Sequence, residues 1–209
     1  MRKSVCVFCA SSENVPEVYR LAAVRTGELC AEQDIQLVNG AGALGLMGLS
    51  SNACLNAGGK VTGVIPQFMV DRGWCHHGLT ELVITPDMAT RRQRMRDLSE
   101  GIICLAGGCG TLEELFETVT QRQMGFYPHP IVLLNTGGYY DALIAWWRRA
   151  QEEHFMRSDH ADLWHVAGTP EEAFRLFQTL PERKDTNEEL SRRWILLKRT
   201  RQPTSLSRS

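Results

Sequence analysis

The chain has 209 residues, of which 43% are hydrophobic, 22% charged and 8% aromatic, a composition typical of one globular domain or at most two small ones. Lysine and arginine total 23 against 24 for aspartate and glutamate, so the net charge of −1 provides no basic field that would attract nucleic acid. No apolar run approaches the ~18 residues that cross a bilayer, and the segment after Arg2 and Lys3 lacks the pattern of a signal peptide. We therefore expect a cytoplasmic protein that binds neither nucleic acid nor membranes.

Short apolar runs recur along the chain, each followed by glycine or by apolar residues at helical spacing. We predict strands at Ser4 to Ala10, Ile35 to Asn39, Lys60 to Ile65, Leu79 to Ile84, Gly101 to Ala106 and Ile131 to Asn135. We predict helices at Pro16 to Gln33, Met47 to Asn56, Met88 to Ser99, Leu112 to Met124, Tyr139 to Phe155 and Pro170 to Gln178. Strands that alternate with helices form a parallel sheet covered on both faces. The predicted fold class is therefore α/β, a Rossmann-like doubly wound parallel sheet in a single domain, with ligands at the carboxyl ends of the strands.

The composition changes after residue 180. Residues 181–209 contain eight basic and four acidic side chains, so this segment has a charge of +4 and the preceding body a charge of −5. We expect a domain over residues 1–180 and a basic C-terminal tail over 181–209. Within the tail, Glu188 to Lys198 has the pattern of a short helix and Gln202 to Ser209 that of a disordered end. A solvated or subunit-docking appendage is a commoner role for such a tail than nucleic-acid binding.

The seven cysteines are odd in number and scattered along the chain, which is typical of a reducing compartment and not of a disulfide framework. Cys6 and Cys9 form a C-x-x-C inside an apolar run, and no second Cys/His pair has the spacing of a zinc site. We therefore predict that both are buried as small hydrophobic residues, with no metal. The histidines, including His160 and His165, are expected on the surface or in loops.

The first glycine-rich loop, Gly40 to Gly45, has the spacing G-x-G-x-x-G directly after a predicted strand. Taken alone this pattern suggests a dinucleotide site. Against that reading, the loop follows the second strand, and the next strand ends at Pro66 without an acidic residue to bind a ribose hydroxyl. A loop for a different ligand, or glycines that only allow a tight turn, are the alternatives.

The second glycine-rich loop is more specific, because Gly107-Gly108-Cys109-Gly110-Thr111 joins a strand to an amphipathic helix. Several backbone N–H groups then converge where the helix dipole adds positive potential, which favours a phosphate. We expect Thr111 to cap the helix. Thr111 to Glu114 also has the spacing of a capping box, like Thr169 to Glu172, so position alone does not make Glu114 catalytic.

The helix that begins at Met88 contains four arginines in nine residues. Met88 and Met95 share its apolar face, and Arg91 and Arg92 lie between them on the same side. We therefore expect at least one guanidinium to be near the buried side. A phosphate or carboxylate ligand would satisfy it, and the alternative is a side chain that extends over the surface to water.

Several of these motifs together resemble the Lonely Guy (LOG) family. The resemblance includes the loop ending Gly45-Leu46-Met47-Gly48, the arginine helix Met88 to Met95 and the stretch Gly107 to Glu114, and it continues through Leu133 to Asp141. It implies hydrolysis of the N-glycosidic bond of adenine-type (cytokinin riboside) nucleoside 5′-monophosphates to the free base and ribose 5-phosphate. It also implies a small-molecule nucleotide substrate, no metal or organic cofactor, and a homodimer, with which the Trp146 and Trp147 helix is compatible.

Carried over by motif position, Arg91 and Glu114 would be the catalytic pair. The residues expected to bind substrate are Gly42, Gly45, Met88, Arg92, Gly107, Gly108, Gly110, Thr111 and Glu113. Ala106, Thr90 and Arg92 depart from the usual family residues, which leaves the preferred base more open than the reaction type.

Three other activities differ from this expectation in testable ways. A nucleotide-binding carrier or sensor of the same fold would bind a phosphorylated ligand without cleaving it, and an AMP nucleosidase would differ only in the base. Lysine decarboxylation generally uses pyridoxal phosphate on a lysine, and the chain has only Lys3, Lys60, Lys184 and Lys198. Only Lys60 lies within the body near a strand, without an arranged partner, so we do not expect that activity.

Overall fold

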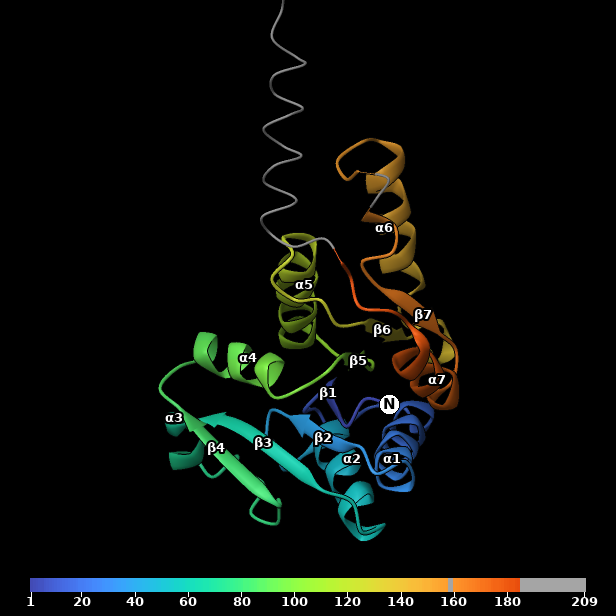
Figure 1. Ribbon diagram of the computed structural model, residues 1–209. Helices are drawn as coiled ribbons and strands as arrows, with labels where there is room; N and C mark the ends of the chain where they lie inside the picture. The colour runs from blue at the N-terminus through green and yellow to red at the C-terminus, as the bar shows by residue number, and fades with distance from the viewer. Residues whose placement is uncertain (158–159, 185–209) are drawn as a thin grey trace, which may run out of the picture.

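The computed structural model describes residues 1–157 and 160–184, so the helix and the disordered end expected within the tail lie outside the described residues. In the described part, one sheet contains β1 (Ser4–Phe8), β2 (Gln36–Asn39), β3 (Val61–Pro66), β4 (Glu81–Thr85), β5 (Ile102–Cys104), β6 (Ile131–Leu134) and β7 (His165–Ala167). Its order is β4-β3-β2-β1-β5-β6-β7 and all neighbours are parallel (Figure 1). The predicted single-domain α/β fold with a doubly wound parallel sheet is confirmed.

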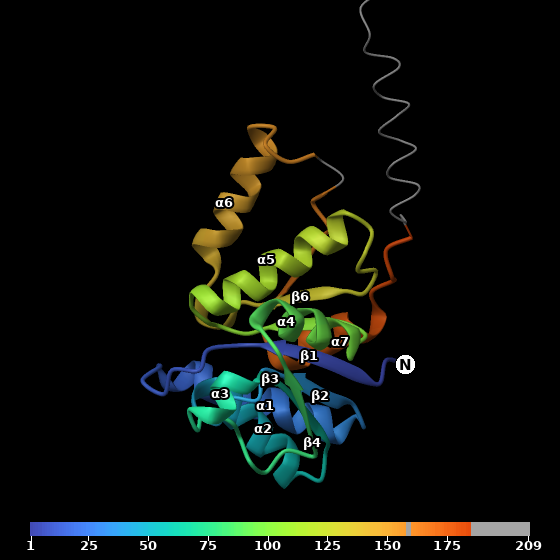
Figure 2. The ribbon, with the colours of Figure 1, turned by 90° about the vertical axis from the view of Figure 1, so that its left-hand side faces the viewer.

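Helices cover both faces of this sheet. They are α1 (Glu17–Glu32), α2 (Gly45–Asn56), α3 (Gln67–Asp71), α4 (Met88–Asp97), α5 (Cys109–Gln123), α6 (Asp141–Glu152) and α7 (Pro170–Thr179), with a 3-10 turn at Thr136–Gly138. Figure 2 shows α1 and α2 on one side of the sheet and α4, α5 and α6 on the other. The helix α7 packs against α1 and belongs to the first side.

The apolar runs of the sequence are continuous because each central strand is buried on both faces. In β1, Val5 and Val7 belong to the core beneath α1, α2 and α7, whereas Cys6 and Phe8 belong to the core beneath α4, α5 and α6. This division follows from the alternation of side chains along a strand. Cys6 and Cys9 are both free and buried, as predicted.

The structure corrects the sequence interpretation at three places. The helix α5 begins at Cys109, three residues before the predicted start at Leu112, because the glycine-rich loop already adopts helical geometry there. His165 lies in β7, where it pairs with Val132 of β6. His160 lies in the connection between α6 and β7, as expected of a loop residue, although it is only 7% exposed because the segment after it buries Leu163 and Trp164. The short α3 was not predicted.

The strand order places a topological switch point between β1 and β5. From β1 the chain moves outward to β2, β3 and β4, and then it crosses back to β5 on the other side of β1. Loops that leave the carboxyl ends of β1 and β5 therefore diverge and open a crevice, where ligands bind in sheets of this kind. Among the described helices, none has both the length and the apolarity needed to cross a bilayer.

Candidate active site

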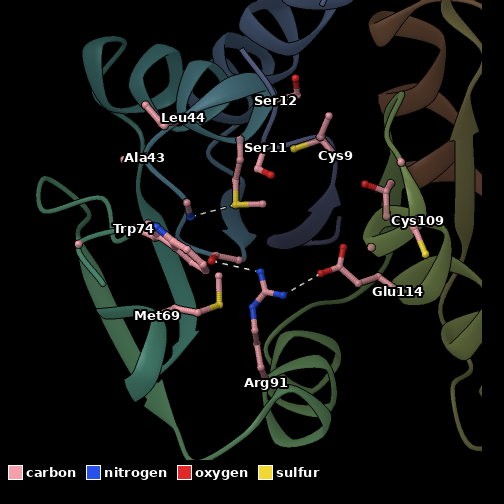
Figure 3. Close-up of a pocket in the computed structure, with 18 residues that line it drawn as sticks. Cys9, Ser11, Ser12, Ala43, Leu44, Met69, Trp74, Arg91, Cys109 and Glu114 are labelled. Carbon is pink, nitrogen blue, oxygen red and sulfur yellow. Dashed lines mark hydrogen bonds and ion pairs between the residues drawn. The ribbon is translucent and has the colours of Figure 1, made fainter. Parts of the chain in front are cut away.

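A cavity of about 700 Å³ opens at this switch point and is lined by 18 residues (Figure 3). Its walls come from the loops after β1, β2 and β5, from the segment around α3, and from the first turns of α4 and α5. Six of the predicted site residues line it: Gly42, Arg91, Gly108, Gly110, Thr111 and Glu114. The sheet topology thus brings together two glycine-rich loops and one arginine that are far apart in sequence.

A buried ion pair joins α4 to α5 at the base of this cavity. The Arg91 Nη1 atom lies 3.1 Å from Glu114 Oε1, and the two residues are only 5% and 6% exposed. The other guanidinium nitrogens donate to backbone oxygens, Nε to Val64 at 3.0 Å and Nη2 to Gly40 at 3.2 Å. In Figure 3 the guanidinium and the carboxylate point toward each other in the cavity. The predicted buried guanidinium is therefore Arg91, and its anionic partner belongs to the protein.

Two effects oppose each other at the Glu114 carboxyl. Burial raises the pKa of this group to about 7, while the nearby Arg91 and Arg92 guanidinium groups act to lower it. Burial prevails because the carboxylate loses more solvation energy on leaving water than it gains from its attraction to the nearby guanidinium groups. Near neutral pH the group is thus divided between its charged and neutral forms, a property common to acid and base groups of enzymes.

The start of α5 distinguishes Glu114 from an ordinary capping glutamate. Gly108 is the N-cap and no side chain caps this helix, so Thr111 already lies inside the first turn and the predicted cap at Thr111 is wrong. At α7, in contrast, Thr169 Oγ1 accepts a hydrogen bond from the Glu172 N–H at 3.2 Å, and Glu172 accepts one from the Gly168 N–H. The capping-box interpretation therefore holds for Glu172 and fails for Glu114.

The first turn of α5 presents backbone N–H groups to the cavity. Gly108, Cys109, Gly110 and Thr111 all line it, and without a side-chain cap their N–H groups remain available for an anion. A Cβ atom added to Gly108 or Gly110 would meet nothing within 4 Å, so these glycines leave the approach to the backbone open. Gly107 does not line the cavity and instead lies against Thr111, whose Oγ1 would be 2.1 Å from an added Cβ.

The G-x-G-x-x-G loop owes its glycines to close packing around the site. A Cβ on Gly40 would lie 1.6 Å from Arg91 Nη2, so only glycine lets the guanidinium approach this backbone. Gly45 has a φ of +64°, and its Cβ would lie 2.4 Å from the Ser11 carbonyl carbon. These contacts explain the loop without a dinucleotide.

Five residues expected to bind substrate do not line the cavity: Gly45, Met88, Arg92, Gly107 and Glu113. Arg92 instead pairs with Glu113 at 3.0 Å and with Glu117, on the outer side of the contact between α4 and α5. Arg96, which is 4% exposed, also pairs with Glu117. These ion pairs of Arg92 and Arg96 with Glu113 and Glu117, here called the clamp, hold together the two helices that carry Arg91 and Glu114.

Other lining residues were missed by the sequence interpretation. Cys9 to Ser12 leave the carboxyl end of β1, and Met47, Met69 and Trp74 form an apolar wall of the cavity. In Figure 3, Met69 and Trp74 lie across the cavity from Cys109 and Glu114 of α5. The position of the first loop beside the switch point could have identified Cys9 to Ser12. No pattern marks Trp74, which reaches the cavity because the chain returns after α3. Among the described residues, no group of three His, Cys, Asp or Glu side chains could hold a metal ion.

Comparisons with known proteins agree with this architecture. The sequence profile of a family described as "Possible lysine decarboxylase" matches residues 47–177. A cytokinin riboside 5′-monophosphate phosphoribohydrolase of Arabidopsis thaliana is 36% identical over 203 residues, which cover 96% of this chain and 88% of that protein. A "Probable cytokinin riboside 5′-monophosphate phosphoribohydrolase" of Oryza sativa subsp. japonica is 37% identical over 183 residues, or 88% of this chain and 73% of that one.

Solved structures with the same fold include two proteins with a different described role. The molybdenum cofactor carrier protein of Chlamydomonas reinhardtii superposes with a TM-score of 0.68 at 19% identity, covering 86% of this chain and 98% of that one. The molybdenum cofactor binding protein of Rippkaea orientalis has a TM-score of 0.66 at 20% identity, with the same coverage. At these identities the likeness establishes a common fold.

Proposed function

The chain belongs to the LOG family of cytokinin riboside 5′-monophosphate phosphoribohydrolases, and from this premise we propose that it hydrolyses adenine-type nucleoside 5′-monophosphates. Water adds to C1′ of the ribose, the bond from C1′ to the base breaks, and the base leaves with that electron pair and gains a proton. The products are the free base and ribose 5-phosphate. The observation that carries this proposal is the buried Arg91–Glu114 pair in a cavity whose other side is the uncapped start of α5.

The dimensions of α5 fit a ribose 5-phosphate. The phosphate would accept hydrogen bonds from the N–H groups of Gly108 to Thr111, where the helix dipole favours negative charge. Glu114 lies five residues beyond Cys109, the first residue of the helix, a rise of roughly 7.5 Å at the usual α-helical pitch. In this proposal the separation keeps the carboxylate away from the phosphate and supports a role for it beside the sugar. The base then faces the apolar wall of Met47, Met69 and Trp74.

The ionised form of Glu114 contributes to this mechanism in two ways. It stabilises the positive charge that develops on the ribose as the base departs, and it orients the attacking water and accepts its proton. Arg91 favours this ionised form through its one hydrogen bond to the carboxylate. Its two other hydrogen bonds, to the carbonyls of Val64 and Gly40, fix the guanidinium in place. Water, a carboxylate and a guanidinium supply every group that the reaction uses, so we propose no metal or organic cofactor.

The family description as a lysine decarboxylase does not fit the cavity. None of its 18 lining residues is a lysine, and Lys60, near the start of β3, is exposed. A lysine that could hold pyridoxal phosphate is thus absent from the cavity lining.

The decisive experiment measures products and not binding. Purified protein is incubated with AMP and with N6-isopentenyl-AMP, and free base and ribose 5-phosphate are quantified by mass spectrometry. We expect both products in equal amounts, with the ratio of the two rates ranking AMP against the modified nucleotide. Calorimetric binding of both nucleotides without release of base would favour the carrier or sensor alternative and reject the hydrolase.

We further propose that the chain forms a homodimer. On α6, Trp146 is 52% exposed, and on the edge strand β4, Leu82 and Ile84 are 39% and 50% exposed. Apolar side chains of this size at a surface are typical of subunit contacts. Light scattering at micromolar concentration would give twice the monomer mass of 23.5 kDa, and the monomer mass alone would reject the dimer.

A cytoplasmic location is also proposed, because all seven cysteines are free and six of them are buried. Unpaired thiols are maintained in reducing compartments. With a net charge of −1, the chain has no overall attraction for nucleic acid, and we propose a small nucleotide as its ligand.

A further inference from the structure

The segment after β6 contacts the glycine-rich loop from outside the cavity. Gly137 and Gly138 have φ values of +60° and +74°, and this tight turn directs Tyr139 and Tyr140 toward the neighbouring strand. Asn135 secures the turn, since its Oδ1 accepts from the Tyr140 N–H and its Nδ2 donates to Asp141, both at 2.7 Å. The helix α6 accordingly begins at Asp141, and the two tyrosines precede it.

Both tyrosine hydroxyls donate to carbonyls of the loop that joins β5 to α5. The Tyr139 hydroxyl donates to the Gly107 carbonyl at 2.9 Å, and the Tyr140 hydroxyl donates to the Leu105 carbonyl at 2.6 Å. Tyr140 is 2% exposed and Tyr139 is 44% exposed. Their rings also meet edge to face, with centroids 4.9 Å apart. Two carbonyls of one loop are therefore bonded to one pair of aromatic side chains that contact each other.

The hydrogen bond from Tyr139 to the Gly107 carbonyl also affects the direction of the Gly108 N–H group. A peptide unit is planar and trans, so the carbonyl of Gly107 and the N–H of Gly108 point in opposite directions. The Gly107 carbonyl is bonded to Tyr139, and neither Gly107 nor Tyr139 is among the lining residues, whereas Gly108 is. The Gly108 N–H therefore points away from Tyr139, and Gly108 lines the cavity in which the proposed phosphate would bind.

We propose that Tyr139 is a positioning residue for phosphate recognition, acting through the Gly107–Gly108 peptide. This inference rests on the proposed function, because it assumes that the start of α5 binds the 5′-phosphate. Tyr139 is not among the residues that line the cavity, so its expected effect on a bound nucleotide is through the loop and not by direct contact. Its contribution applies equally to the ground state and the transition state, so its loss raises KM and leaves kcat unchanged.

The test compares Tyr139→Phe with wild type, and Tyr19→Phe serves as the matched control. The Tyr19 and Tyr139 rings are in contact, with their centroids 5.4 Å apart, but the Tyr19 hydroxyl is not bonded to the glycine-rich loop. In Tyr139→Phe we expect ribose 5-phosphate to bind about three- to tenfold more weakly, the range for one lost hydrogen bond. KM for AMP should rise by the same factor, with kcat within about twofold. Binding of adenine, which has no phosphate, and the midpoint of thermal unfolding should not change.

A second measurement monitors the Gly107–Gly108 peptide directly by NMR. In 15N spectra of wild type, ribose 5-phosphate should shift the Gly108 amide resonance, and this shift should be smaller in Tyr139→Phe and normal in Tyr19→Phe. Equal binding and equal shifts in wild type and Tyr139→Phe would overturn the positioning role. A parallel loss of adenine binding or of thermal stability would also overturn it, because it would indicate general support of the fold. If wild type does not bind ribose 5-phosphate at all, the proposed function itself fails.

Discussion

The chemistry of this protein centres on one carboxyl group whose burial and ion pair act in opposite directions. Glu114 is held by Arg91 at 3.1 Å, yet its burial raises its pKa to about 7. Such a balance gives a group that changes charge within the physiological range, which a surface glutamate does not do. The consequences can be measured at two single residues.

The first consequence concerns pH. Because the proposed mechanism uses the ionised carboxylate, kcat/KM should rise with pH through an apparent pKa of about 7 and then level off. The substrate phosphate adds a separate limb near its own second pKa of about 6. In Glu114→Gln the pH profile of the residual kcat/KM should keep the rise due to the substrate phosphate and lose the rise near pH 7. A wild-type rate that falls above pH 7 would instead indicate a protonated, acid-donating Glu114.

The second consequence concerns Gly40, where only a hydrogen atom fits beside Arg91. In Gly40→Ala the added Cβ would lie 1.6 Å from Arg91 Nη2, so the guanidinium must move and Glu114 loses its alignment. A displacement of about 1 Å costs on the order of 100-fold in rate, and we expect that loss in kcat/KM. Gly168→Ala is the control, since its Cβ would meet Glu172 at an ordinary 3.7 Å. Normal activity in Gly40→Ala would show that the Arg91 position is not critical.

At the scale of elements, α4 and α5 matter because together they carry the reactive pair. Arg92 and Arg96 of α4 both bind Glu117 of α5, one turn beyond Glu114. Burial alone would raise the pKa of Glu117, and the hydrogen bonds from Arg96 and Arg92 overcome this effect and lower it. The clamp therefore stabilises the fold when Glu117 is ionised.

Replacing this clamp should change stability in a pH-dependent way. The pKa of Glu117 is lower in the folded protein than in the unfolded chain, where it is about 4.3. The ionised group therefore stabilises the folded protein at pH values above about 4.3, and this stabilisation disappears as the pH falls through the pKa of the folded state. Glu117→Gln should therefore lower the free energy of unfolding by about 1–2 kcal/mol at pH 7, with a difference that shrinks below about pH 4. Denaturant titrations at both pH values measure it. Glu153→Gln, which removes an exposed partner of Arg149, should change little, and an equal loss in both variants would contradict the clamp.

The elements show how far sequence reasoning extends. Strands β1, β2, β3, β5 and β6 follow from apolar runs because strands inside a covered sheet bury both faces. The edge strand β4 also follows from an apolar run, although most of its residues are exposed. The start of α5 was misplaced because glycine and cysteine at its first positions have low helix propensity, whereas the local structure is determined by the loop around it. Arg92 and Glu113 were assigned to substrate because sequence shows neighbours along the chain and not partners across two helices. Only the fold shows that these two side chains bind each other.

At the scale of the whole molecule, the strand order creates the site. Cys9, Arg91 and Glu114 belong to segments about 80 and 20 residues apart in sequence, and they meet because β1 lies beside β5. The alternation of strands and helices predicts a crevice at the carboxyl ends, but it does not state which loops border it. The apolar wall with Trp74 depends on the path after α3, for which the sequence has no periodic signal.

The most direct test of the whole account is the rate of base release by Glu114→Gln in a single turnover, measured together with its affinity for ribose 5-phosphate. One positioned carboxylate contributes about 10²- to 10⁴-fold in rate, so we predict a loss of that size in base release. Affinity for ribose 5-phosphate should stay close to that of wild type, because the phosphate is bound by the start of α5. A variant that releases base at a rate near that of wild type would contradict the account, since Glu114 would then have no part in the chemistry.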